Sequence, residues 1–263
     1  MGKRKKLGQH FLIDKNIARK IVQLAEIKPD ETVVEIGPGR GILTRLLIQE
    51  AKRVIAIELD RDLYQTLQVE LRETPTLSLI QGDALDYSYK SIDGVFKIVA
   101  NLPYSITTPL LFRMFELKEK IPSMTLMVQK EVADRIIANP SSKAYGPLSV
   151  AVQLYADSKT CFLVRPTCFL PRPRVASAVI QIHRLPSLRV PVQERFFLRI
   201  VKAAFGHRRK TLKNSLRDAG LKEETVRHAL QLSQIIGTRR AETLSIEEFG
   251  RLSNILFELG VQI

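Results

Sequence analysis

The sequence lacks the features that would place the protein in a membrane, in a secretory route or around a structural metal. No run of 18 apolar residues occurs, so we expect no membrane span. The basic N-terminus, MGKRKKLGQHF, has no apolar segment and no small-residue cleavage site, which predicts a cytoplasmic protein. The only two cysteines, Cys161 and Cys168, have neither metal-site nor CxxC spacing. We therefore expect reduced structural thiols and no bound metal.

Acidic residues are scarce in one part of the chain. The 263 residues include 41 Lys and Arg against 27 Asp and Glu, a net charge of +14. From Arg165 to Arg217 there are thirteen basic residues and one acidic residue, Glu194, so this segment carries +12 of that charge. Such a concentration predicts a polyanionic partner, in particular a nucleic acid. The alternative is a solvated surface that only keeps the protein in solution.

Apolar periodicity predicts an α/β domain followed by helices. Strands are expected at 31–36, 53–59, 76–81, 94–100, 123–129 and 177–185. Helical patterns lie between them at 41–51, 61–73, 105–117 (with Ser105 as a possible N-cap) and 130–140. This alternation predicts a parallel sheet covered on both faces. Beyond a linker at 183–192, further helical patterns occupy 194–205, 208–220, 223–232 and 245–259. We predict a catalytic domain at 1–185 and a small all-helical domain at 191–263.

A glycine loop follows the first predicted strand, in VVEIGPGRGILT. Gly37, Gly39 and Gly41 have the spacing G-x-G-x-G, whereas dinucleotide sites use G-x-G-x-x-G. The acidic residue before the loop, Glu35, suits a cationic ligand better than a pyrophosphate. Glu58 ends the next strand, where a carboxylate can accept both hydroxyls of a ribose. Together these residues predict a site for S-adenosylmethionine. The alternative is a tight turn with unrelated surface acids.

Polar residues also follow the third and fourth predicted strands, at the edge of the sheet where ligands bind. Asp83, after the third, can accept a hydrogen bond from the exocyclic amine of the cofactor's adenine. The fourth ends in NLPY, where the Asn101 side-chain oxygen and the Leu102 carbonyl could hold an exocyclic amine of a base. Tyr104 could stack on that base. No general base is required, so catalysis would depend on positioning and desolvation. The alternative is an Asn-Pro turn with a core tyrosine.

Seven motifs, taken together, resemble the ribosomal RNA adenine N6-dimethyltransferase family over nearly the whole chain. They are GQHFL (8–12), VVEIGPGRGILT (33–44), IELD (57–60), GDAL (82–85), NLPY (101–104), FLPRPRVASAV (169–179) and AFGHRRKTLKNSL (204–216). The resemblance implies a Rossmann-like S-adenosylmethionine-dependent methyltransferase with a mainly parallel seven-stranded sheet. It also implies dimethylation of two adjacent adenines in a 3′-terminal hairpin of small-subunit ribosomal RNA, late in subunit assembly. Separately from the resemblance, we expect a monomer.

The resemblance assigns roles to individual positions. Cofactor contacts are expected at His10, Leu12, Gly37, Gly39, Gly41, Glu58, Asp83 and Asn101. Position 10 is often Asn in the family and is His here. We therefore expect the backbone of His10, rather than its side chain, to contact the cofactor.

Contacts to the target base are expected at Asn101, Tyr104 and Phe169. Phe169 precedes a loop stiffened by Pro171 and Pro173, which could hold its ring for stacking on a base. The alternative for Phe169 is a ring packed in the core. Phosphate contacts are expected in the basic run 207–217, at Arg208, Arg209, Lys210 and Lys213.

Four other functions are disfavoured by features of the sequence. DNA adenine methyltransferases carry a related tetrapeptide that begins with Asp, and the neutral Asn101 argues against them. Within the family, antibiotic-resistance enzymes act on large-subunit RNA, whereas the segment FGHRRKTLKNSL favours the small-subunit branch. A non-enzymatic RNA-binding assembly or transcription factor would be expected to lose the acids or NLPY, and both are present. An NAD dehydrogenase is disfavoured by the glycine spacing.

Overall fold

The computed structural model of the protein describes residues 9–103, 106–207 and 209–263, which fall into two compact units. The first unit contains the chain up to residue 133 and residues 158–184, and the second contains residues 134–157 and 185–263. The division after residue 184 lies close to the predicted domain boundary. Residues 134–157 differ from the prediction, which assigned them to the first domain. They include the apolar helix α6 (Pro147–Tyr155), which packs with α7 (Glu194–Ala204).

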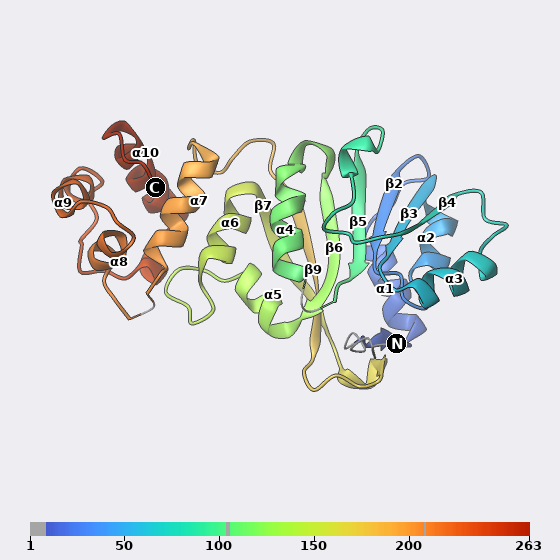
Figure 1. The fold of residues 1–263 in the computed structure, drawn as a ribbon. Helices are drawn as coiled ribbons and strands as arrows, with labels where there is room; N and C mark the ends of the chain where they lie inside the picture. The colour runs from blue at the N-terminus through green and yellow to red at the C-terminus, as the bar shows by residue number, and fades with distance from the viewer. Residues whose placement is uncertain (1–8, 104–105, 208) are drawn as a thin grey trace, which may run out of the picture. The chain divides into compact units, whose positions relative to one another are not determined.

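A seven-stranded sheet forms the centre of the first unit (Figure 1). Its order is β4 (Leu77–Gln81), β3 (Arg53–Glu58), β2 (Thr32–Ile36), β5 (Phe96–Asn101), β6 (Ser123–Gln129), β9 (Ser177–Arg184) and β7 (Ala156–Val164). The first five strands are parallel, and β9 runs antiparallel to β6. The predicted mainly parallel sheet is confirmed. The edge strand β7 was not predicted, because its sequence ADSKTCFLV begins with polar residues and has no clear alternation.

Both faces of this sheet are buried, as expected for parallel strands covered by helices. Consecutive residues on β2 and β3 are inaccessible, among them Val33 and Val34 on β2 and Val54 and Ile55 on β3. One face packs with residues of α1 (Lys15–Leu24) and α2 (Thr44–Glu50) in a single apolar cluster. The other helices of this part are α3 (Arg61–Glu70), α4 (Thr107–Glu116) and α5 (Lys130–Ile136). Helix α1 was not predicted, although Asp14 caps its N-terminus.

The second unit is mainly helical. Besides α6 and α7, it contains α8 (Leu212–Asp218), α9 (Glu223–Leu232) and α10 (Ile246–Glu258). Helix α8 begins later than predicted because the Thr211 side chain accepts a hydrogen bond from the Asn214 amide and caps it there. A reciprocal pair of hydrogen bonds between Ser245 and Glu248 starts α10. The predicted helical C-terminal region is confirmed.

A second, very small sheet joins two segments that lie far apart in sequence. Strand β1 (Phe11–Leu12) pairs antiparallel with β8 (Phe169–Leu170), so that Phe11 is opposite Leu170 and Leu12 opposite Phe169. In Figure 1 the yellow loop before β9 accordingly runs beside the N-terminal segment. This pairing was not predicted. Among the helices of the described residues, none has the length and apolar character needed to cross a membrane.

Candidate active site

The loop after β2 turns sharply because three glycines adopt backbone angles that other residues avoid. Gly37, Gly39 and Gly41 have φ values of +68°, +59° and +73°. A Cβ atom at Gly39 would lie 3.2 Å from Cδ1 of Phe11. A Cβ atom at Gly41 would lie 2.5 Å from Nη1 of Arg45. The predicted glycine turn is therefore present, and at Gly39 it lets the loop backbone approach an aromatic ring from the N-terminal segment.

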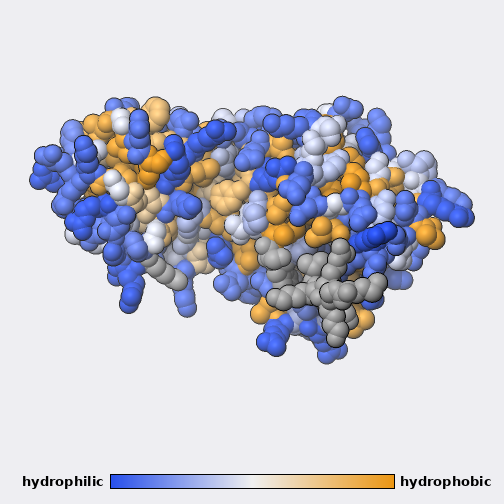
Figure 2. Space-filling view, viewed as in Figure 1, coloured by the Kyte–Doolittle hydropathy of each residue, from blue (hydrophilic) through white to orange (hydrophobic). Residues whose placement is uncertain are grey.

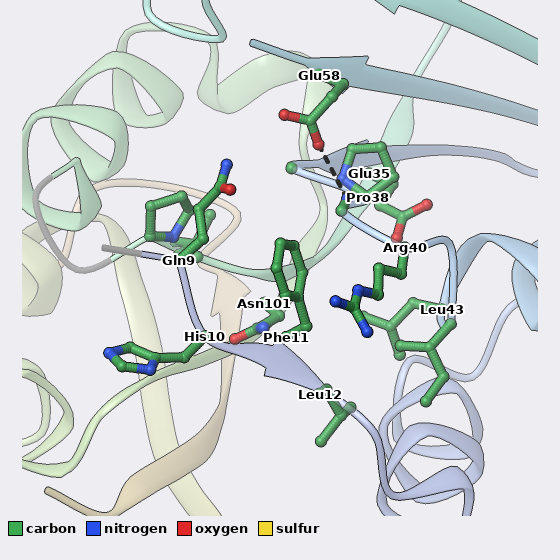
Figure 3. Close-up of a pocket in the computed structure, with 15 residues that line it drawn as sticks. Gln9, His10, Phe11, Leu12, Glu35, Pro38, Arg40, Leu43, Glu58 and Asn101 are labelled. Atoms are coloured by element: carbon green, nitrogen blue, oxygen red, sulfur yellow. Dashed lines mark hydrogen bonds between the residues drawn. The ribbon is translucent and has the colours of Figure 1, made fainter. Parts of the chain in front are cut away.

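A cavity of about 300 Å³ lies beside this loop. Its walls come from the N-terminal segment, the glycine loop and the ends of β2, β3 and β5. The residues predicted to contact the cofactor that line it are His10, Leu12, Gly37, Gly39, Glu58 and Asn101. Figure 3 shows His10, Leu12, Glu58 and Asn101 among the side chains that line this cavity. The structure thus brings together residues from four separate sequence motifs.

The carboxylate of Glu58, at the end of β3, is held by two backbone amides. Oε2 accepts a hydrogen bond of 2.9 Å from the Gly39 amide, and Oε1 accepts one of 2.9 Å from the Asp60 amide (Figure 3). The side chain is buried, and this burial raises its pKa. A carboxylate has about four acceptor positions, so both oxygens retain capacity for hydroxyl donors such as those of a ribose.

Glu35 is the second acid of the cavity and is more deeply buried. Only 1% of the residue is exposed, and its Oε2 has no hydrogen-bond partner in the part of the chain that the structure describes. Burial raises the pKa of Glu35 to about 8, and the charge of Glu58 adds to this effect. A buried carboxyl oxygen without a partner is costly, and although Thr44 lowers the pKa of Glu35 in part, a cation in the cavity would further favour its ionised form. The site is therefore suited to a positively charged ligand.

Asn101 and Pro103 place the NLPY turn against the glycine loop. Asn101 ends β5, and the next amide, that of Leu102, donates a hydrogen bond of 3.0 Å to the Met127 carbonyl on β6. The ring of Pro103 lies 3.8 Å from the position of a Cβ at Gly37. Asn101 thus lies in the wall of the cavity that also contains the two acids, on a backbone that is hydrogen-bonded to β6. Tyr104 lies outside the described residues.

The N-terminal segment contributes a wall that was not predicted in detail. The Arg40 guanidinium lies 4.7 Å from the centre of the Phe11 ring, and the two side chains are adjacent in Figure 3. This cation–π contact covers the glycine loop from one side. Lining residues not singled out from the sequence are Gln9, Phe11, Pro38, Arg40, Ile42 and Leu43. Most of them lie within the GQHFL and GPGRG motifs, so these motifs could have been used to predict them as lining residues.

Gly41 and Asp83 were predicted to contact the cofactor but are not among the residues that line the cavity. At Gly41 a side chain would collide with Arg45 and Leu67. Glycine at this position therefore allows close packing against these two residues. Asp83 lies just beyond the end of β4, and its Oδ1 accepts a hydrogen bond of 2.8 Å from the Leu85 amide. This bond stabilises the turn after the strand. A contact between Asp83 and an adenine stays a prediction.

Phe169 does not present its ring to the cavity. The residue is 2% exposed and belongs to the apolar cluster that includes Leu12, Ile21 and Val179. Alternation along β8 turns Phe169 inward and Leu170 outward. In this structure Phe169 is a core residue, contrary to the expectation of a ring held ready for a base.

The predicted phosphate contacts lie around α8, and two of them are engaged in ion pairs. Lys210 Nζ lies 2.5 Å from Asp218 Oδ2, and Lys213 Nζ lies 2.7 Å from Glu223 Oε1. The hydrogen bond from Lys210 lowers the pKa of Asp218. Arg209 is exposed, and Arg208 lies outside the described residues. Figure 2 shows one face of the protein, on which hydrophilic residues cover most of the surface.

The cysteines take no part in the cavity. Cys161 and Cys168 are free thiols, and burial raises the pKa of both. In the described ranges, no group of three or more His, Cys, Asp or Glu side chains is arranged to hold a metal ion.

The donor set fits S-adenosylmethionine. The unpartnered Oε2 of Glu35 suits a cationic part of the ligand, and the amide-held carboxylate of Glu58 suits a ribose. The left-handed glycines leave backbone open along the cavity wall. Phe11 and Leu43 add apolar surface to the same walls.

Comparisons with known proteins agree with this geometry. A family model described as ribosomal RNA adenine dimethylase matches residues 1–258. Curated proteins named ribosomal RNA small subunit methyltransferase A, from Clostridium botulinum (strain Loch Maree / Type A3) and Clostridium acetobutylicum, are 45% and 44% identical. The first match covers 97% of this chain and 94% of the relative, and the second covers 96% and 93%.

Two solved structures resemble the whole chain. A dimethyladenosine transferase from Plasmodium falciparum gives a TM-score of 0.81 at 25% identity, covering 96% of this chain and 99% of that one. The 23S rRNA methyltransferase ErmE gives 0.73 at 25% identity, covering 94% and 99%. The chain therefore belongs to the ribosomal RNA adenine dimethylase family, and it is a methyltransferase that uses S-adenosylmethionine.

Proposed function

We propose that the protein transfers methyl groups to N6 of two adjacent adenines in a 3′-terminal hairpin of small-subunit (16S) ribosomal RNA, giving N6,N6-dimethyladenine. Support comes from relatives named for the small subunit, which match over almost the whole of both chains. The observation that carries the chemistry is the convergence of Glu35, Glu58 and Asn101 on one cavity.

When bound, the cofactor supplies a methyl group on a positively charged sulfur. The protein's task is to hold a poorly nucleophilic amine in line with that methyl group. The side-chain oxygen of Asn101 accepts a hydrogen bond from one N–H group of adenine N6. The Leu102 carbonyl is proposed to accept a hydrogen bond from the second N–H group. With both N–H groups held, the nitrogen lone pair is directed toward the methyl group, which is a gain in positioning.

No side chain is needed to remove a proton before attack. The amine becomes acidic once it has accepted the methyl group, and it then loses a proton to water. For the second transfer the remaining N–H is held in the same way. The cavity walls, which include the Phe11 ring and the buried Leu102, are proposed to limit the access of bulk water to the reacting nitrogen. Tyr104, by family resemblance, is proposed to stack on the adenine.

The basic segment 165–217 is proposed to bind the RNA backbone. The ion pairs of Lys210 and Lys213 lie near the surface, and exposed ion pairs contribute little free energy. A phosphate group can therefore replace Asp218 or Glu223 as a partner at small cost. Because charge alone does not select a sequence, specificity must come from the shape of a structured RNA whose adenines can leave the stack.

Large-subunit RNA is the second candidate substrate, because the ErmE structure resembles 94% of this chain. The decisive experiment incubates the protein and labelled S-adenosylmethionine with immature small subunits, large subunits and deproteinised RNA from a strain that lacks the enzyme. We expect label only in small subunits, recovered as N6,N6-dimethyladenosine. Label in large subunits alone would assign the protein to the resistance enzymes, and equal label in all three would refute a role in subunit assembly.

We further propose that the protein acts as a monomer in the cytoplasm, where ribosomal subunits are assembled in bacteria. Light scattering during gel filtration tests the monomer, and a stable dimer at micromolar concentration would contradict it.

A further inference from the structure

The small sheet of β1 and β8 connects the cavity wall to the loop before β9. Phe11, which lines the cavity, pairs directly with Leu170. His10, which also lines the cavity, donates a hydrogen bond of 2.8 Å from Nδ1 to the Pro171 carbonyl. Two consecutive loop residues are thus fixed to two consecutive residues of the cavity wall. Leu170 is therefore the direct neighbour of a residue in the cavity wall, although it does not itself line the cavity.

The two faces of this sheet have different surroundings. Leu12 and Phe169 turn into the core, whereas Leu170 is 51% exposed. Ile13 is 48% exposed, and its amide continues the pairing with a 2.9 Å hydrogen bond to the Cys168 carbonyl. Side-chain alternation places Ile13 and Leu170 on the same face as diagonal neighbours. Single exposed apolar residues are ordinary, but here two lie on one face of the strand pair that includes the cavity residue Phe11.

The loop that presents Leu170 is also cationic. Arg172 and Arg174 are exposed, and neither side chain has an ion-pair or hydrogen-bond partner within the described residues. Pro171 precedes Arg172, Pro173 lies between the two arginines, and both prolines limit the conformations of the loop. Apolar surface flanked by free guanidinium groups matches an RNA strand, which has flat apolar bases on a phosphate backbone.

We propose that Leu170 is a positioning residue that acts as an apolar wedge against the base next to the target adenine. This inference rests on the proposed function, because an adenine in a structured RNA must leave the base stack before N6 can reach Asn101. Apolar side chains inserted at a base step stabilise an unstacked conformation. Leu170 occupies the space beside the displaced adenine, Ile13 supports it, and Arg172 and Arg174 bind the flanking phosphates.

The test uses small subunits reconstituted with a ligated 3′ RNA segment in two forms. One has the natural sequence, and the other has an abasic nucleotide beside the target adenines. The abasic neighbour removes a stacking partner, so the adenine leaves the stack without help from the protein. Methyl transfer by wild type and by Leu170→Ala is measured on both forms, giving kcat and KM for each.

We expect Leu170→Ala to lower kcat/KM on the natural RNA by about tenfold, the scale for losing the burial of one leucine side chain. On the abasic RNA the variant should match wild type within about twofold, because the unstacking step is already made. Leu170→Met keeps the side-chain volume and should restore most of the rate. Leu163→Ala is the matched control, since Leu163 is also exposed (56%) but lies on β7. Unfolding temperatures should not differ, because Leu170 is exposed.

Equal loss on the two RNA forms would overturn the wedge, since it would indicate a general defect in binding or folding. Full activity of Leu170→Ala on the natural RNA would overturn it as well. If wild type labels neither form while it labels large subunits, the proposed substrate is wrong and the wedge proposal fails with it. Failure of the proposed substrate is therefore seen with wild type alone, whereas failure of the wedge proposal is seen only by comparing wild type with Leu170→Ala.

Discussion

The amide of Gly39 donates a hydrogen bond of 2.9 Å to Oε2 of Glu58, which ties the turn after β2 to the carboxylate that ends β3. This hydrogen bond fixes the loop after β2 relative to the end of β3. A ligand that uses Glu58 meets a carboxylate already oriented by backbone amides, so little conformational entropy is lost on binding.

Glu58→Ala should weaken S-adenosylmethionine binding by roughly 1.5–3 kcal/mol, the scale of hydrogen bonds to a charged group. Titration calorimetry measures the change. Asp62→Ala, at an exposed acid in the first turn of α3, is the matched control and should bind as wild type. Unchanged affinity in folded Glu58→Ala would contradict the assignment of Glu58 to the ribose.

Glu35 should make the free energy of unfolding depend on pH. Burial raises its folded-state pKa to about 8 from an ordinary value of 4.5, so the folded protein keeps a proton that the unfolded chain releases. The stabilising contribution is complete below pH 4.5 and is lost as the pH rises through about 8. Glu35→Gln, which cannot ionise, should lack this loss.

Urea unfolding of wild type and Glu35→Gln at several pH values between 5 and 8.5 measures the effect. The difference between the two proteins should move in favour of Glu35→Gln as the pH rises, by at most about 1.4 kcal/mol for each pH unit. Taking the difference cancels the groups that the two proteins share. A difference that does not change with pH would show that Glu35 is ionised in the free protein.

Asn101→Ala should separate binding from methyl transfer. Because the proposed role of Asn101 is to orient the amine, kcat should fall by about 100-fold or more while the cofactor Kd changes little. Asn139→Ala, an exposed residue after α5, controls for the loss of an amide side chain. Near wild-type turnover in Asn101→Ala would mean that NLPY is only a turn.

Phe169 should behave as a core residue. Phe169→Ala should lower the free energy of unfolding by roughly 3–5 kcal/mol, and Phe169→Leu by considerably less. The Phe169 ring is buried in the apolar core and does not face the cavity, so Phe169→Leu should retain most of the methyl-transfer rate. Urea unfolding and methyl transfer are measured on the same samples. A well-folded Phe169→Leu that has lost activity would instead support stacking of the ring on the base, as the sequence predicted.

Reversal of charge at Arg209 and Lys210 should weaken binding to small subunits and reduce its salt dependence. For every phosphate that the variant no longer binds, the slope of log K against log salt should become shallower by roughly 0.7–0.9. Cofactor affinity should not change. The double variant Lys52→Glu and Arg72→Glu, at two exposed cations of the first unit, makes the same change in net charge and is the control. An unaltered slope in the Arg209 and Lys210 variant would show that this cluster does not touch RNA.

The sequence predicted those parts of the site whose geometry is local. Gly37, Gly39 and Glu58 follow strand ends in a parallel sheet, and strand order alone brings such ends to one edge. Asn101 was found for the same reason. The helices α7, α9 and α10 were predicted within two residues because their apolar spacing and caps lie within a single segment.

The features that were missed depend on pairing between distant segments. Strand β8 pairs with β1 across more than 150 residues, and only this pairing decides that Phe169 faces the core and Leu170 the solvent. The edge strand β7 has a run of polar residues in its first half and no clear alternation, and it pairs with β9 at the end of the sheet. The pairing of Lys210 with Asp218 likewise depends on how the loop before α8 folds back on that helix.

The chain passes between its two compact units three times, after residues 133, 157 and 184. Tyr145, in the inserted part, donates a hydrogen bond of 2.9 Å to the Leu244 carbonyl and packs its ring against Phe205. A fragment that begins at residue 185 would lack these interactions and expose the apolar surface that they cover. During synthesis, the first unit cannot complete its sheet until β9 has left the ribosome, and the inserted helix α6 must wait longer still for the helices that cover it.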